Sequence, residues 1–297
     1  MQWEKEAEER LQRVPFFVRK KVKKQVEDFV SSQGRSLVTS LDLTQARQQL
    51  TGGQSIKTAG GSLTAEELDR IAALVDRGVI IEGLNTRYRQ FKVCGGAGGC
   101  PLSLIDEESL ALSLKEIAEE MDLDGFIAGG IDGPVLFHHR FKVALAGCPN
   151  NCSQPQIVDF AVIGQARPGL VGGKCNHCRL CLESCQEKAI TLEAGGPLFH
   201  ADLCLNCGDC ARVCPRDVIG HEQLGYRVLV GGKLGRHPRL AQTVAPLVDE
   251  NTVKEIFRRS LSLFKAKALD GERFADLVHR LGFQPVKDFL IGEGENN

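Results

Sequence analysis

Apolar residues in the first 50 positions follow the spacing of helices. They recur three or four residues apart in the segment VPFFVRKKVKKQVEDFV, at Val18, Val22, Val26, Phe29 and Val30. The lysine-rich stretch 20–24 lies largely off this stripe, and such a stretch is more often a solvated helix face than a docking site. Residues 1–50 are therefore expected to form a small helical module.

The pattern changes after a glycine-rich stretch, TGGQSIKTAGGS at 51–62, which is typical of a linker. Helices are then predicted at 63–78, 106–121, 252–269 and 272–282, and strands at 87–93, 141–147, 157–164 and 226–232. Two shorter apolar pieces, AITL at 189–192 and DVIG at 217–220, are predicted as small strands. The mixture predicts an α+β fold.

Composition limits the partners of this chain. It has 297 residues, of which 42% are apolar and 25% are charged, and this is enough for a sizeable core. The formal net charge of -1 gives no general attraction to nucleic acid or to an anionic membrane. No apolar run approaches the roughly 20 residues of a membrane span, and the N-terminus is too charged for a signal peptide. We therefore expect a cytoplasmic protein with no nucleic-acid partner and no membrane span.

The chain has 12 cysteines, which in a reducing compartment serve more often as metal ligands than in disulfides. Eight of them form two runs with the spacing C-x2-C-x2-C-x3-C, namely Cys175, Cys178, Cys181 and Cys185, then Cys204, Cys207, Cys210 and Cys214. In such a run three thiolates hold one 4Fe-4S cluster, and the fourth serves the cluster of the other run. Cys185 is thus assigned to the second cluster and Cys214 to the first.

The two runs together resemble a bacterial two-cluster ferredoxin over residues 165–220. Pro215 follows the last cysteine, as in that family, whereas Gln186 replaces the proline expected after the first run. Two zinc sites are the alternative, because thiolates also bind zinc. Zinc would not need a third cysteine at this spacing, and the cluster interpretation is therefore preferred.

The remaining cysteines are Cys94 and Cys100, in VCGGAGGCP, and Cys148 and Cys152, in AGCPNNC. This pattern resembles the cluster signature of the sulfite and nitrite reductases that carry sirohaem. The resemblance implies a third 4Fe-4S cluster on these four thiolates, with Cys152 also bridging to the sirohaem iron. Asn150 and Asn151, in the same loop, are candidate cofactor-binding residues. Four unrelated buried thiols are the alternative.

Basic residues precede both halves of this cysteine set. Arg140 and Lys142 alternate on the predicted strand before Cys148, and Arg87 and Arg89 alternate before Cys94, so each pair shares one face of its strand. The resemblance to the sulfite and nitrite reductases implies that these four are catalytic residues that bind an anionic substrate. That family has Lys-x-Lys where this chain has Arg140 and Lys142.

Two further segments carry a resemblance. Residues 225–241 resemble the part of the reductases that lies near the tetrapyrrole carboxylates, and the candidates for cofactor binding there are Gly231, Gly232, Arg236 and His237. For any one of these basic residues, a solvated surface charge is the alternative. The N-terminal module, with its early Trp3 and its VPFFVRKKV core, resembles the small helical module of the B chain of dark-operative protochlorophyllide reductase.

These observations predict four parts. They are a helical module at 1–50, a sulfite/nitrite reductase-like αβ domain in two pieces at 63–164 and 221–297, and a ferredoxin domain at 165–220 that interrupts it. The resemblance implies three 4Fe-4S clusters and sirohaem. It also implies six-electron reduction of sulfite or nitrite, with electrons from a low-potential donor.

The main alternative is a non-catalytic three-cluster electron carrier without sirohaem. A weaker one is a sirohaem protein that acts on another tetrapyrrole or substrate. In the sulfite and nitrite reductases, the half that holds the cluster cysteines follows another half of similar size, which supplies part of the sirohaem pocket. In this chain only residues 51–90 are available for that first half. Arg87 and Arg89, a second subunit or a second copy of the chain could complete the sirohaem pocket; otherwise sirohaem is absent.

Overall fold

The computed structural model describes residues 1–12, 16–39, 42, 57–58, 61–62, 81, 83–131, 133 and 136–292. The chain divides into two compact units, Met1–Arg70 and Ile71–Asn297. The predicted helix at 63–78 and most of the predicted linker lie outside the described residues. No helix in the described ranges is both long enough and apolar enough to cross a bilayer.

The first unit contains the predicted helices, α1 (Lys5–Gln12) and α2 (Phe16–Ser32), and two short strands, β1 (Gln2–Trp3) and β2 (Leu37–Val38), that pair in parallel. Its core contains Ala7, Val26, Phe29, Val30 and Val38. The predicted stripe is thus confirmed at Val26, Phe29 and Val30, and the side chains of Val18 and Val22 lie outside the described residues. Within the predicted linker, β3 (Lys57–Thr58) and β4 (Gly61–Ser62) pair as antiparallel strands.

The second unit is built on a five-stranded sheet with the order β11-β10-β7-β6-β5. The strands are β5 (Arg89–Val93), β6 (Phe141–Ala146), β7 (Phe160–Leu170), β10 (Ile219–Val230) and β11 (Gln242–Val248). β5, β6 and β7 are parallel, whereas β7, β10 and β11 are antiparallel. The pattern of apolar residues predicts all of these strands except β11. That strand contains Pro246, which is tolerated because β11 lies at the edge of the sheet.

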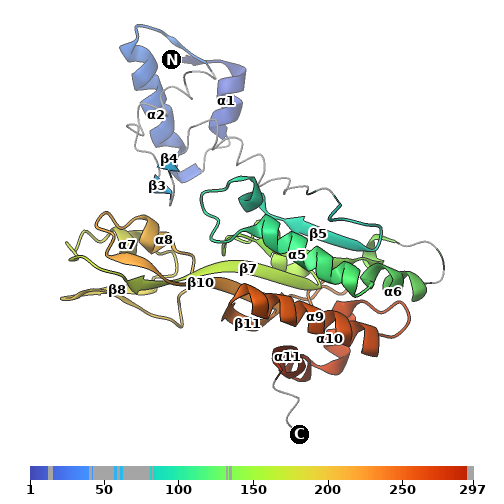
Figure 1. Cartoon of the computed structure of the whole chain (residues 1–297). Helices are drawn as coiled ribbons and strands as arrows, with labels where there is room; N and C mark the ends of the chain where they lie inside the picture. Colours follow the sequence, from blue (N-terminus) through green and yellow to red (C-terminus); the bar gives the residue numbers. More distant parts are fainter. Residues whose placement is uncertain are drawn as a thin grey trace. The chain divides into compact units, whose positions relative to one another are not determined.

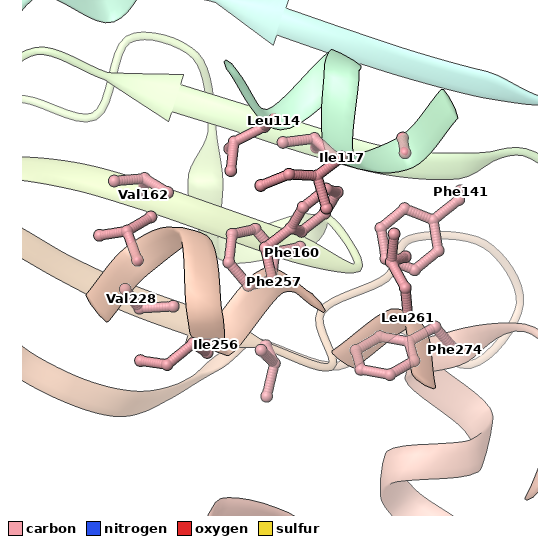
Figure 2. Close-up of a cluster of buried hydrophobic side chains, with 14 of the residues drawn as sticks. Leu114, Ile117, Phe141, Phe160, Val162, Val228, Ile256, Phe257, Leu261 and Phe274 are labelled. Atoms are coloured by element: carbon pink, nitrogen blue, oxygen red, sulfur yellow. The ribbon is translucent and has the colours of Figure 1, made fainter. Parts of the chain in front are cut away.

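Helices cover one face of this sheet (Figure 1). They are α5 (Glu107–Glu120), α6 (Leu123–Gly129), α9 (Glu250–Lys267), α10 (Phe274–Leu281) and α11 (Phe283–Ile291). Figure 2 shows Leu114 of α5 and Phe257 of α9 packed with Phe160 of β7 in the core between helices and sheet. Asp106 and Asp249 cap α5 and α9, and each accepts a hydrogen bond from a backbone N–H in the first turn. The predicted helices at 106–121, 252–269 and 272–282 are confirmed, and α11 is an additional one.

β7 and β10 extend together beyond the rest of the sheet, and the cysteine runs lie between them in the chain. The two strands pair from Val230↔Phe160 to Ile219↔Leu170. Their far end carries α7 (Leu180–Ser184), α8 (Asp209–Arg212), β8 (Ile190–Glu193) and β9 (Gly196–Phe199), as Figure 1 shows. The sequence suggests that 189–192 and 217–220 form the small strands here. The first is confirmed as β8, which pairs with β9, whereas residues 219–220 of the second begin the long strand β10.

The predicted domain boundaries at 165 and 220 fall inside continuous strands. β7 runs through the first boundary and β10 through the second. The ferredoxin-like part is therefore joined to the sheet by two paired strands, and the ladder between them has one register shift, between His221 and Gln223, just after the second boundary. A division into separate domains stays a prediction.

Candidate functional site

The third cysteine set, Cys94, Cys100, Cys148 and Cys152, lies where two parallel strands end. Cys94 follows β5, and Cys148 comes two residues after β6. Because the two strands are in register at Val93↔Leu145, their carboxyl ends meet at one edge of the sheet. The Cys94 amide donates to the carbonyl of Leu145 at 3.0 Å, and Cys100 and Cys152 are near enough to Cys148 to raise the pKa of its thiol, which burial raises most. The fold thus brings together cysteines that are up to 58 residues apart (152 − 94).

Backbone amides and a buried carboxyl group surround Cys94. The amides of Gly147 and Gly96 donate to Cys94 Sγ at 3.1 and 3.3 Å. Glu107, which is 1% exposed, accepts a hydrogen bond from Ser103 Oγ at 2.6 Å and contacts Cys94 Sγ at 3.3 Å. Burial, together with the negative charge of the neighbouring Glu107, raises the pKa of Cys94 to about 12. A metal bound to Cys94 would therefore displace the thiol proton and bind the buried thiolate. The sequence pattern does not single out Glu107.

A side chain at Gly147 has no room. A Cβ atom there would overlap the carboxylate of Glu107 and the hydroxyl of Ser103. We therefore expect Gly147→Ala to lower the free energy of unfolding by about 1–3 kcal/mol, the usual cost of overpacking, measured by urea titration. Gly129→Ala is the matched control, because its added Cβ has no neighbour within 4 Å and it ends a helix. Equal destabilisation by the two substitutions would contradict the close-packing explanation.

Cys152 differs from the other members of this set, because it is exposed whereas Cys94 is buried and Cys100 and Cys148 are half-buried. The loop around it contains two buried polar atoms, Asn151 Oδ1 and Ser153 Oγ, that have no hydrogen-bond partner in the described part of the chain. Asn150 is exposed, and Asn151 adopts a left-handed conformation with φ 57°. An exposed thiol beside an unpaired amide oxygen and an unpaired hydroxyl group is suitable for binding a cofactor in addition to a cluster.

The other eight cysteines line two hollows. One, of about 340 Å³, contains Cys175, Cys178, Cys181 and Cys214, the first ferredoxin set. The other, of about 640 Å³, contains Cys185, Cys204, Cys207 and Cys210, the second ferredoxin set. Each hollow therefore combines three cysteines of one run with the last cysteine of the other, which is the exchange that the spacing predicts. Within the described ranges, no three His, Cys, Asp or Glu side chains come close enough to hold a single metal ion.

Basic residues gather around the start of β6. Lys142 Nζ lies 3.9 Å from the centre of the Phe137 ring, and Arg140 Cζ lies 5.5 Å from it, so the two side chains approach the same aromatic group as their alternation predicts. Burial lowers the pKa of Lys142, and the nearby Arg273 and Arg140 lower it further. Arg273 comes from the start of α10, 131 residues after Lys142 (273 − 142), and the sequence pattern does not identify it as part of this group.

Asp159 holds this group in place. It is 1% exposed, it accepts hydrogen bonds from the backbone amides of Lys142 and Ala275 at 3.0 and 3.2 Å, and it pairs with Arg273 at 3.2 Å. One buried carboxylate thus connects β6 to the N-terminus of α10. Arg273 Nε is buried and has no hydrogen-bond partner among the described residues.

The structure corrects the prediction for Arg89. Its side chain is 3% exposed and pairs with Glu119 at 2.6 Å and with Asp124 at 3.4 Å. Arg89 is in register with Phe141, whose side chain lies in the core beneath the helices. Lys142, the next residue along β6, points to the opposite face of the sheet. Arg87 precedes the strand, and its carbonyl oxygen accepts a hydrogen bond from Arg140 Nε at 3.2 Å. Of the two upstream arginines, only Arg87 lies beside the basic group.

The predicted residues after β10 occupy two environments. Gly231 and Gly232 are buried, and their amides donate to the carbonyls of Asp159 and Val158 at 2.9 Å. A side chain at Gly232 would overlap the backbone of 156–158, so close packing alone requires this glycine. Arg236 and His237 are exposed in the turn that follows.

The base of this turn carries two further basic residues. Lys233 and Arg239 flank the turn and both pair with Asp276 of α10, at 2.5 and 2.7 Å. Neither of them follows from the sequence pattern. The turn is therefore attached to the helix that also supplies Arg273.

A cysteine set at the end of a sheet, a ferredoxin-like extension with two further sets and a basic group on the adjoining strand are features typical of an iron–sulfur protein. The family model described as the nitrite and sulphite reductase 4Fe-4S domain matches residues 85–294. The chain belongs to this family of iron–sulfur oxidoreductases. A second model, described as the protochlorophyllide reductase 57 kD subunit, matches residues 3–47.

Two relatives and one solved structure show the range of similarity. The chain is 30% identical to a coenzyme F420-dependent sulfite reductase of Methanocaldococcus jannaschii, over 76% of this chain and 35% of that protein. It is 24% identical to the alpha subunit of a dissimilatory-type sulfite reductase of Allochromatium vinosum, over 74% of this chain and 55% of that protein. A crystal structure of dissimilatory sulfite reductase I matches with a TM-score of 0.50 at 15% identity, over 95% of this chain and 89% of that one, and shows the fold alone. The chain thus spans about a third to a half of these two relatives.

Proposed function

We propose that this chain reduces sulfite or nitrite at a sirohaem held against the third cysteine set. The observation that carries the proposal is the exposure of Cys152, the one thiol of that set that is free to face a second group. Sirohaem would supply an iron that binds the substrate and a macrocycle that accepts electrons from the cluster. The unpaired Asn151 and Ser153 beside Cys152 are suitable hydrogen-bonding partners for such a group.

The basic group would act on the substrate. Sulfite and nitrite are small oxyanions, and cations that are held in place before binding stabilise the charge that develops on oxygen as bonds break. Arg140 and Lys142 would neutralise these oxygens. The lowered pKa of Lys142 also makes its ammonium group a better proton donor than an exposed lysine. Arg273, which pairs with Asp159, adds a third positive charge.

The second ferredoxin set would deliver electrons to the third cysteine set. Its hollow is also lined by Pro149 and Asn150, which lie between Cys148 and Cys152. Two hydrogen bonds hold the loop of the second ferredoxin set against β7. The Ala166 amide donates to the carbonyl of Asn206 at 2.7 Å, and Gln165 Nε2 donates to the carbonyl of Leu205 at 2.9 Å. The first ferredoxin set has no such neighbour among the residues that line its hollow. Electrons would therefore pass from the first set to the second and then to the third.

The cofactor content tests this assignment. Protein purified without oxygen from a host that makes sirohaem is expected to contain about twelve iron atoms in clusters and one more in sirohaem, because the cysteines form three sets of four. Iron analysis and the optical spectrum measure the two contents separately. Iron near eight would remove the third cluster. A spectrum without tetrapyrrole bands would favour the electron carrier without sirohaem.

A further inference from the structure

The two ferredoxin sets differ in how much protein covers them. All residues from 171 to 180 are exposed except Cys175, which is half-buried, so the loop that holds the first set lies at the surface. In the second set, Cys185, Cys204 and Cys207 are half-buried and Cys210 is buried. The residues that cover the second set include the loop between Cys148 and Cys152. Electrons from another molecule can therefore reach the first set through the thinner layer of protein.

The surface around the first set carries basic residues. Two neighbouring hollows adjoin it and share Cys175, one of about 340 Å³ and the other of about 940 Å³. Their charged or titratable lining residues, apart from the cysteines, are Lys174, His177, Arg179 and Arg216. No Asp or Glu in the described part of the chain lines either hollow. The hollow of the second set, in contrast, is lined by Glu187 and Asp209.

Exposed apolar side chains accompany these charges. Leu170 and Val171 are 56% and 59% exposed, and Leu180 is 41% exposed. Together with Lys174, Arg179 and Arg216 they form what we call the entry face. Exposed apolar side chains next to several basic ones are typical of a surface that binds a protein partner briefly, with charge guiding the encounter. The exposed Asp217, which follows Arg216 and lies near Cys214, is an acidic residue at the border of this face.

We propose that the entry face docks a small acidic electron-carrier protein, and that this partner reduces the first ferredoxin set. The proposal rests on the proposed function in one respect, namely that electrons enter at the first ferredoxin set and pass from there to the second and third sets. In each encounter one electron leaves the reduced centre of the carrier and enters the cluster of the first set. The carrier is oxidised by one electron, the cluster is reduced by one electron, and no atoms are exchanged. An acidic surface on the carrier would face Lys174, Arg179 and Arg216, while its apolar atoms contact Leu170, Val171 and Leu180.

The test compares two reductants of the anaerobically purified full chain. One is a reduced acidic bacterial ferredoxin, and the other is reduced methyl viologen, which is small and needs no docking surface. Stopped-flow absorbance follows cluster reduction, and equilibrium binding of the oxidised ferredoxin is measured at several salt concentrations. In the double variant Lys174→Glu with Arg179→Glu, we expect reduction by ferredoxin at low salt to slow roughly tenfold or more, since steering raises association rates by about 10–1000-fold. Reduction by methyl viologen should keep its rate.

Lys254→Glu with Arg258→Glu is the control. It changes the net charge by the same amount on α9, which lies far along the sheet from α7 in Figure 1. This variant should be reduced by ferredoxin at nearly the wild-type rate. The proposal is overturned if the entry-face variant accepts electrons from ferredoxin as fast as the wild type. It is also overturned if the control slows equally, or if reduction by methyl viologen falls in parallel.

These outcomes are independent of substrate turnover. If ferredoxin reduces the clusters as expected but no donor supports reduction of sulfite or nitrite, the proposed function fails while the entry face stands. If methyl viologen supports turnover and the entry-face variant behaves as wild type with ferredoxin, the entry face fails alone.

Discussion

Replacing Cys152 by alanine is expected to remove the tetrapyrrole absorption bands and to abolish reduction of sulfite and nitrite together. The reason is that one exposed thiolate would serve both the cluster of the third set and the sirohaem iron, so its loss takes a ligand from each. We expect iron content to fall by up to the share of one cluster and sirohaem. The measurements are the optical spectrum, iron analysis and turnover with reduced methyl viologen, all on anaerobically purified protein.

Cys178→Ala is the matched control for Cys152→Ala. Cys178 is also an exposed thiol on a surface loop, but it belongs to the first ferredoxin set. This variant should keep the tetrapyrrole bands while losing the outer relay cluster. A Cys152→Ala protein with a normal spectrum and normal turnover would show that Cys152 does not bridge the two cofactors.

Replacing Lys142 by alanine is expected to slow sulfite and nitrite reduction roughly 30- to 1000-fold without loss of cofactors. A cation that contacts the oxyanion in a site shielded from water is worth about 2–4 kcal/mol of transition-state stabilisation. The half-buried position of Lys142, beside Arg273 and Arg140, is consistent with such a role, because burial and these two positive charges lower its pKa, and its acidic neighbour Asp159 pairs with Arg273. Turnover with reduced methyl viologen measures the effect.

Two controls accompany Lys142→Ala. Lys254→Ala removes a lysine that pairs with Glu250 on the surface of α9, and such a pair is worth about 1 kcal/mol or less. Arg140→Lys restores the residue that the sulfite and nitrite reductases usually have and should remain active. If Lys142→Ala reduced either anion at the wild-type rate, the basic group would not be the substrate site, and a non-catalytic electron carrier would be the better interpretation.

The cysteine spacing is the part of the site that could be predicted best. Three ligands of one cluster lie within a few residues on one tight loop, so a short stretch of sequence is enough to predict them. The exchange of Cys185 and Cys214 between the two runs follows from the same rule. The hollows of the structure contain the predicted groups of four. Most strands and amphipathic helices could also be predicted from the sequence, because burial of one face gives the apolar residues a regular spacing along the chain.

The positions of the basic residues could be predicted only in part from the sequence. Alternation places Arg87 with Arg89, and Arg140 with Lys142, but it does not say which face of the sheet the helices will cover. The structure turns Arg89 toward Glu119 under the helices, whereas Lys142 faces the other way. Arg273 joins Lys142 only because α10 packs against the start of β6 through Asp159, a contact across more than a hundred residues of chain.

The sequence by itself determined the αβ character of the second unit and the family to which residues 85–294 belong, and it predicts which thiols share a cluster. Those properties depend on spacing and periodicity over short stretches of chain. Only the tertiary structure decided that Cys152 faces outward while Cys94 is buried, that the second ferredoxin set lies against the loop of Cys148, and that the first set is left near the surface. Exposure and neighbours depend on which distant segments pack together, and no local pattern encodes that packing.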